Sequence, residues 1–119
     1  MLSEQVLDRR RWRNGLYDKL LTSSILRLLP DYITPNTLTI DIGGNSGYQT
    51  YFHAKYNNVV TYEPVPELFK VLQSNLKFID NVTLVNKAVT DKNKDVELFV
   101  DINRLSMTSQ MPLVESKAI

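Results

Sequence analysis

The hydrophobic positions of this chain change their spacing along its length. In residues 16–29, leucine and isoleucine recur at steps of three and four, which predicts an amphipathic helix. Pro30 ends this helix because an interior proline loses a backbone hydrogen bond and clashes with the preceding turn. A shorter helix is predicted around residues 4–13, and the polar residues 31–36 predict a connecting loop.

Short β-branched runs alternate with helical stretches in the rest of the chain. The first run, residues 37–42, is almost wholly apolar and is expected to be a strand buried on both faces. A polar turn at residues 91–94 precedes residues 96–100, which we expect to form a hairpin with the strand before the turn. The other predicted elements are strands at residues 59–63 and 82–85, a helix at residues 48–56, and a helix from Pro66 that buries Leu68, Leu72 and Leu76.

This order of elements predicts an α/β fold with a Rossmann-like parallel sheet. N-terminal helices precede the sheet, and a C-terminal β-hairpin strand follows it. The rule of right-handed crossovers places the first three strands in the spatial order three, two, one. We therefore expect a helical segment at residues 1–35 and a Rossmann-like domain at residues 36–119, in which residues 103–119 receive no assignment.

Composition narrows the class of protein further. The 119 residues hold 14 Lys and Arg against 13 Asp and Glu, a balance that excludes a strongly basic nucleic-acid coat protein. The absence of Cys excludes a disulfide scaffold and a thiolate zinc site, and a single His excludes a His-rich metal site. No apolar run approaches the roughly 20 residues that span a bilayer. Residues 1–5 also lack the basic start of a signal peptide, so we expect a cytoplasmic protein with no membrane partner.

Candidate chemistry lies in the loop after the first predicted strand. Ligands of open α/β sheets bind outside the carboxyl ends of the strands, and here Asp41 is followed by Gly43, Gly44, Asn45, Ser46 and Gly47. The glycine pattern of a dinucleotide site is broken by Asn45 and Tyr48, and no Gly-Lys-Ser/Thr of a phosphate-binding loop follows. An acid two residues before the first glycine suits a cationic amine and repels a phosphate.

A second acid, Glu63, ends the second predicted strand, 22 residues after Asp41. A carboxylate at this place can hydrogen-bond both hydroxyls of a ribose. Taken singly, the glycines suit an ordinary turn and Glu63 a solvated strand end. A carboxylate in an apolar strand, however, needs a hydrogen-bond donor. An acid for an amine, a glycine loop and an acid for a ribose together indicate S-adenosylmethionine as the cofactor.

The same residues resemble the FkbM-type family of S-adenosylmethionine-dependent methyltransferases, a class I, Rossmann-like group. Residues 40–47 (IDIGGNSG) resemble the family's D-[VI]-G-A-N-x-G loop, with Gly44 where alanine is usual. Residues 62–69 (YEPVPELF) resemble its F-E-P-x-P segment, and residues 72–76 (LQSNL) its L-x-x-N-L helix. Residues 85–91 (VNKAVTD) resemble the end of its third strand.

The resemblance implies methyl transfer to an unidentified acceptor, a hydroxyl oxygen being one candidate, from S-adenosylmethionine as the small-molecule donor. It implies that Asp41 and residues 43–47 hold the methionine moiety, Glu63 the ribose and Ala88 the adenine edge. It covers residues 37–100, and no K-I-D-x-E-G-type motif follows that range. We therefore expect only the cofactor-binding half of the fold, incomplete at its C-terminus. The alternative is a non-catalytic or degenerate S-adenosylmethionine-binding module that acts as an interaction protein.

No catalytic residue is assigned from the sequence, because methyl transfer mainly needs donor and acceptor to be positioned. His53, Tyr48 and Tyr51 are candidate bases, but a surface histidine on a helix and tyrosines in the core or a pocket wall are the plainer interpretations. The basic cluster at residues 9–13 is interpreted as the solvated face of a helix. The alternative is phosphate contact with Trp12 stacked on a base. We therefore expect no nucleic-acid partner.

The predicted strand order also indicates where another chain could pair with the sheet. It leaves the first strand at an edge, where apolar side chains and unpaired amides favour pairing with another chain. We therefore expect a homo-oligomer, or a second polypeptide that completes the sheet, along or near that edge.

Overall fold

The computed structural model describes Ser3, Glu4, Leu7, Arg11, Trp12, Asp31 and residues 33–101, together with the backbone of residues 116–118. The predicted helix at residues 16–29, most of the basic cluster at residues 9–13 and most of residues 103–119 lie outside the described residues. Glu4 and Leu7 are helical, and the N–H of Leu7 donates to the carbonyl of Ser3, as the predicted N-terminal helix requires.

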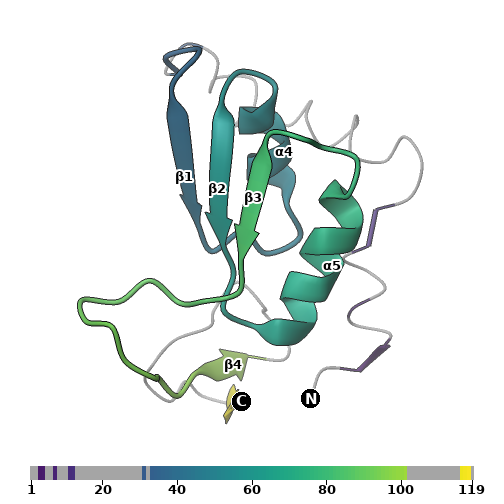
Figure 1. The fold of residues 1–119 in the computed structure, drawn as a ribbon. Helices are drawn as coiled ribbons and strands as arrows, with labels where there is room; N and C mark the ends of the chain where they lie inside the picture. The colour runs from purple at the N-terminus through teal and green to yellow at the C-terminus, as the bar shows by residue number, and fades with distance from the viewer. Residues whose placement is uncertain are drawn as a thin grey trace.

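The described residues form a parallel sheet with helical crossovers (Figure 1). Its strands are β1 (Leu38–Ile42), β2 (Asn58–Tyr62) and β3 (Val82–Val85), in the spatial order β1-β2-β3. The helix α4 (Tyr48–Ala54) joins β1 to β2, and α5 (Pro66–Leu76) joins β2 to β3. The predicted order of the three strands is therefore confirmed, and each element lies within two residues of its predicted bounds.

The helix α5 contributes more buried hydrophobic residues than any other described element. Its buried residues follow the predicted leucine stripe and are Leu68, Val71, Leu72 and Leu76. Pro66 occupies the first helical turn together with Glu67, as expected of a helix start. On its other flank, α5 packs against Leu7 and Val100 in one hydrophobic cluster, so that both ends of the described chain are anchored to this helix.

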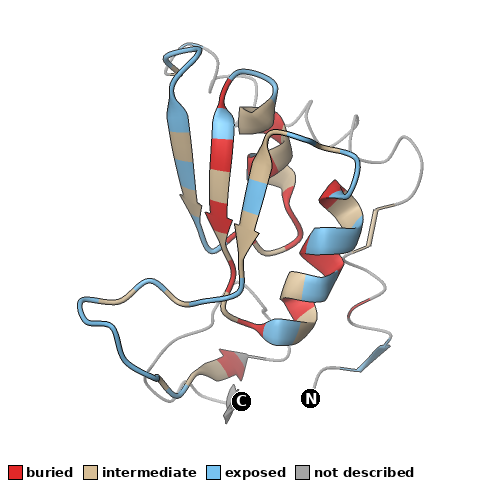
Figure 2. Cartoon of the chain, in the orientation of Figure 1, coloured by how far each residue is buried: buried red, intermediate tan, exposed pale blue. Residues whose placement is uncertain are grey.

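The two faces of the sheet are covered unequally (Figure 2). On the face that packs against α4 and α5, Val59 and Thr61 are buried. On the opposite face, Leu38, Ile40 and Ile42 are exposed, and no helix among the described residues covers them. The expectation that the first strand is buried on both faces is therefore wrong for the described part of the chain. An apolar run has two buried faces only if crossovers lie on both sides of the sheet, and here both lie on one side.

The predicted hairpin after β3 is also wrong. The strand β4 (Phe99–Asp101) pairs antiparallel with β5 (Ser116–Ala118) in a separate two-stranded sheet. A polar loop at residues 86–98 leads the chain away from β3 before β4 begins (Figure 1). Val100 is fully buried in the hydrophobic cluster beside α5. Its side chain therefore packs against α5 and not along the edge of β3. Among the described residues, no helix has the length and apolar character needed to cross a membrane.

Candidate functional site

The loop at residues 43–47 turns the chain from the end of β1 into α4. Gly43, Asn45 and Gly47 have φ values of 82°, 53° and 104°, a conformation that favours glycine and asparagine. The N–H groups of Gly43 and Gly44 both donate to the carbonyl of Tyr62, at 2.8 and 3.0 Å. The N–H of Gly47 donates to the carbonyl of Gly44 at 2.9 Å. Since these amides are engaged within the protein, the loop is not built as a phosphate cradle.

Asp41 lies half-buried near the carboxyl end of β1 and has the donor that its setting requires. Its Oδ2 accepts a hydrogen bond of 2.6 Å from the hydroxyl of Thr50 in α4. The hydroxyl of Thr61 lies 2.8 Å from that of Thr50. Because the one proton of Thr50 is directed at Asp41, Thr61 is the donor in this second bond. The hydroxyls of Thr61 and Thr50 thus form a chain of two hydrogen bonds that ends at the carboxylate of Asp41.

Asp41 also lines a cavity of about 290 Å³ at the carboxyl end of β1. The rest of the wall is formed by the loop and the first turn of α4, namely Ile42, Gly43, Gly44, Asn45, Ser46, Tyr48 and Gln49. The predicted acid and most of the predicted loop residues therefore meet at one small cavity. Thr50 was not assigned to the site from the sequence. The available signal was a hydroxyl in the first turn of the helix after the loop.

Glu63 directly follows β2 and connects two parts of the site. Only 4% of the residue is exposed. Its Oε1 accepts a hydrogen bond of 2.9 Å from the N–H of Asn45, and its Oε2 one of 2.8 Å from the N–H of Val65. Burial raises the pKa of the Glu63 carboxyl and the charge of Asp41 raises it further, against the lowering effect of the two N–H bonds. Glu63 thus ties the loop after β1 to the start of α5.

The raised pKa of Glu63 predicts how the free energy of unfolding changes with pH. Its folded-state pKa lies above the unfolded one, so ionised Glu63 costs the folded state stability at neutral pH. This cost disappears as the pH falls through the folded pKa toward the unfolded one. We therefore expect the free energy of unfolding of the wild type to rise, relative to Glu63→Gln, between about pH 7 and about pH 5. Urea unfolding of both proteins at the two pH values measures this change. A constant difference, or one that moves toward the variant, would contradict it.

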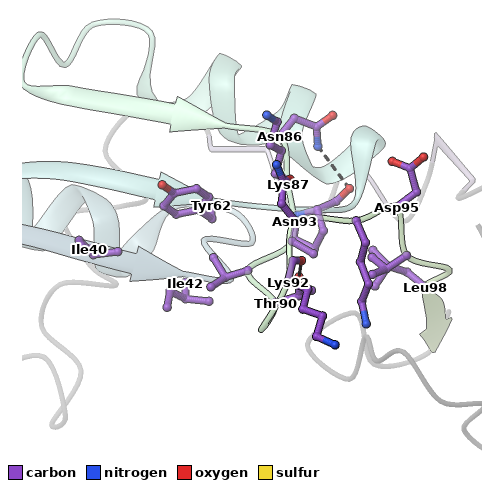
Figure 3. A pocket seen from close by; sticks show the side chains of 15 residues that line it. Ile40, Ile42, Tyr62, Asn86, Lys87, Thr90, Lys92, Asn93, Asp95 and Leu98 are labelled. Carbon is purple, nitrogen blue, oxygen red and sulfur yellow. Dashed lines mark hydrogen bonds between the residues drawn. The ribbon is translucent and has the colours of Figure 1, made fainter.

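A larger cavity, of about 980 Å³, lies at the carboxyl ends of β2 and β3 (Figure 3). Its wall includes Ile42, Tyr62, Pro64 and Ala88. Ile42 lines both cavities, so the two adjoin at the end of β1. Ala88, which the resemblance assigns to adenine, therefore lies in this larger cavity, whereas Glu63 lines neither of the two.

Asn86 holds the loop after β3 against the segment that follows β2. Its Nδ2 donates to the carbonyl of Glu63 at 2.8 Å. It also donates to the carbonyl of Pro64 at 3.3 Å (Figure 3). The backbone that follows carries Lys87 and Lys92 into the cavity wall. The wall of the larger cavity therefore combines apolar side chains with charged ones, which include Asp95 as well as the lysines.

Trp12 packs against two tyrosines of α4, one of which lines the smaller cavity. The ring of Trp12 stacks on Tyr48, with centroids 5.5 Å apart, and meets Tyr51 edge-on at 5.6 Å. The backbone N–H of Trp12 donates to Oδ1 of Asn75, whose Nδ2 donates to the carbonyl of Ser46. Tyr48 is thus a wall residue of the cavity, as predicted. Trp12 is engaged in intramolecular stacking, which disfavours the alternative in which it stacks on a base.

His53 takes a different position from the one predicted. It is half-buried in the last turn of α4, with its ring edge-on to Phe52, and is not a surface side chain. Its Nδ1 is buried and forms no hydrogen bond within the described part of the chain. His53 lines neither cavity, so its position does not suit a base at this site.

Comparison with known proteins adds no relative to this picture: no protein-family model matches the chain, and a search of curated proteins finds no match. The geometry of the site and the resemblance in its motifs therefore carry the functional argument. The structure brings Asp41 and residues 43–46 together at one cavity and places Ala88 at the next, whereas Gly47 lines neither cavity and Glu63 is buried.

Proposed function

We propose that this chain binds S-adenosylmethionine at the carboxyl edge of its sheet, as the cofactor-binding part of a class I methyltransferase of the FkbM type. The observation that carries the proposal is the setting of Asp41. One carboxylate oxygen is held by Thr50, and the residue lines a cavity whose other walls come from the glycine loop. A carboxylate fixed in this way favours a cationic amine through a charge-assisted hydrogen bond. The methionine moiety of the cofactor carries such an amine.

The adjoining larger cavity supports the rest of the proposal. A nucleoside needs a flat apolar wall and space beyond the second strand, and Tyr62, Pro64 and Ala88 offer both. Ile42 at the junction of the cavities allows one extended ligand to reach from Asp41 to Ala88. A role of Glu63 toward the ribose would use lone pairs that its two backbone N–H partners leave open.

Methyl transfer requires little of the chain beyond positioning the methyl donor and the acceptor. When bound, S-adenosylmethionine supplies an activated methyl group on a sulfonium. Asp41 and the loop at residues 43–47 would bind and orient the donor, which is the main requirement of an in-line displacement. We assign no base, and the acceptor stays unidentified; a hydroxyl acceptor would also need a group to remove its proton.

One observation favours the alternative, a non-catalytic or degenerate S-adenosylmethionine-binding module. Glu63 is buried, and each of its oxygens already accepts a backbone N–H. A carboxylate used in this way stabilises the loop whether or not a cofactor binds. The alternative therefore predicts a folded protein that binds the cofactor weakly or without methyl transfer.

Titration of the purified chain with S-adenosylmethionine tests the proposal. We expect saturable binding, and a rise of about tenfold or more in Kd for Asp41→Asn, because the amide keeps the shape but loses the charge. Asp80→Asn is the matched control, since Asp80 is exposed and precedes β3 at the opposite end of the sheet. Its Kd should equal that of the wild type.

Thermal melting gives an independent measure of the same binding. At a ligand concentration of a hundred times Kd, the folded state gains about 2.7 kcal/mol. A folded wild type with no binding would refute the proposal, and binding unaffected by Asp41→Asn would place the cofactor elsewhere. Binding without methyl transfer to hydroxyl or amine acceptors would support the non-catalytic alternative.

A further inference from the structure

The strand β1 is an edge of the sheet with an open apolar face. Among the described residues, its only strand partner is β2 (Figure 1). The side chains on its open face are exposed by 60% at Leu38, 59% at Ile40 and 63% at Ile42 (Figure 2). Natural edge strands are ordinarily protected by lysine, proline, another charged residue or a bulge. Residues 38–42 (LTIDI) contain no lysine or proline, and their one charged side chain, Asp41, is bonded to Thr50 of α4 on the opposite face of the sheet. The edge is therefore suited to pairing with another strand.

Among the described residues, the backbone groups of β1 without a strand partner belong to the same three residues. On either side of the strand, the N–H of Thr37 donates to Oδ1 of Asn57 and the N–H of Gly43 to the carbonyl of Tyr62. Backbone groups alternate in direction along a strand, so the odd-numbered residues face β2. The N–H and C=O groups of Leu38, Ile40 and Ile42 therefore point away from the sheet.

We propose that two copies of this chain pair through β1, antiparallel and about a twofold axis at Ile40. In this register Ile40 lies opposite Ile40 of the second copy, and Leu38 lies opposite Ile42. An antiparallel ladder exchanges both hydrogen bonds at alternate residues, and these are the residues whose amides point outward. The five-residue strand is then paired along its whole length, with the apolar side chains of both copies in one continuous stripe.

The charges of the strand agree with this register. Asp41 is the one charged residue of β1, and it lies opposite Thr39 of the second copy, not opposite its own counterpart. The net charge of +1 adds little repulsion between the copies. The result is one continuous sheet in the order β3-β2-β1-β1-β2-β3, with a closed, isologous interface. This proposal does not depend on cofactor binding.

Sedimentation velocity of the whole chain tests the proposal. The wild type should sediment as a species of twice the chain mass of 13.7 kDa. Ile40→Lys and Ile40→Glu should each be monomeric at concentrations where the wild type is dimeric, because residue 40 meets its own copy and places like charges together. Mixing the two variants should restore the dimer, since opposite charges then meet at the axis. Thr83→Lys is the control, because Thr83 is exposed on the same sheet face but belongs to β3.

Each other outcome has a definite meaning. A monomeric wild type would overturn the proposal, because β1 would then not pair with a second copy of this chain. A dimer that survives Ile40→Lys, or variants that stay monomeric after mixing, would overturn the register. Circular dichroism checks that the variants are folded, which we expect because the side chain of Ile40 is exposed in the single chain.

Discussion

Replacement of Gly44 by alanine is expected to destabilise the fold by about 3 kcal/mol, the upper part of the usual range for overpacking. A Cβ atom at this position would lie 2.3 Å from Cγ2 of Thr61 and 3.3 Å from Cδ2 of Leu72. Thr61 cannot turn away at low cost, because it is fully buried in the central strand and its hydroxyl is bonded to Thr50. The added methyl must therefore displace the backbone of the loop. Urea unfolding measures the effect.

A second substitution separates this clash from other effects of alanine. Thr61→Ser removes Cγ2 but keeps the hydroxyl that Thr50 accepts, so Gly44→Ala with Thr61→Ser should be more stable than the sum of the single changes predicts. We expect a favourable coupling of about 1 kcal/mol or more. Strict additivity would contradict the packing described here.

Leu72→Ala is expected to cost about 2–5 kcal/mol of unfolding free energy, as is usual for a leucine removed from a packed core. Leu72 is 0% exposed, and its Cδ1 would lie 2.9 Å from a Cβ placed on Gly47. The side chain therefore supports the loop at residues 43–47 as well as the core. Denaturant unfolding gives the size of the loss.

Phe78→Ala is the matched control for this prediction. Phe78 follows α5 and is 82% exposed, so its removal should change the unfolding free energy by no more than about 0.5 kcal/mol. If Leu72→Ala and Phe78→Ala had equal effects, α5 would not be packed against the loop as described. In that event the glycine loop would owe its shape to local hydrogen bonds alone.

Much of the architecture could be predicted from local patterns. The leucines of α5 recur at a spacing of four and are buried, because a helix places such residues on one face. The parallel order of β1, β2 and β3 followed from the alternation of strands and helices and from the handedness of crossovers. The same topology placed the end of β1 beside the segments that follow β2 and β3, since parallel strands end at one edge of the sheet.

Other features could not be predicted because they depend on contacts between distant parts of the chain. The apolar run of β1 predicted two buried faces, but whether a second layer exists is decided by where the crossovers pass. Alternation at residues 96–100 predicted a strand, but β4 pairs with β5 because burial of Val100 beside α5 competes with pairing along β3. A periodic pattern specifies that a side chain is buried and not which surface buries it.

The candidate site also has some features that the sequence determined and others that only the tertiary structure decided. By itself, the sequence determined the acid, the glycine loop and their place at the carboxyl edge, because these depend on residue type and strand order. Only the tertiary structure decided that Thr50 holds Asp41 and that Glu63 accepts two backbone N–H groups from opposite sides. Hydrogen-bond partners of carboxylates are chosen by distance and direction in space, and residues as far apart in the sequence as Asn45 and Glu63 carry no local pattern that records the pairing.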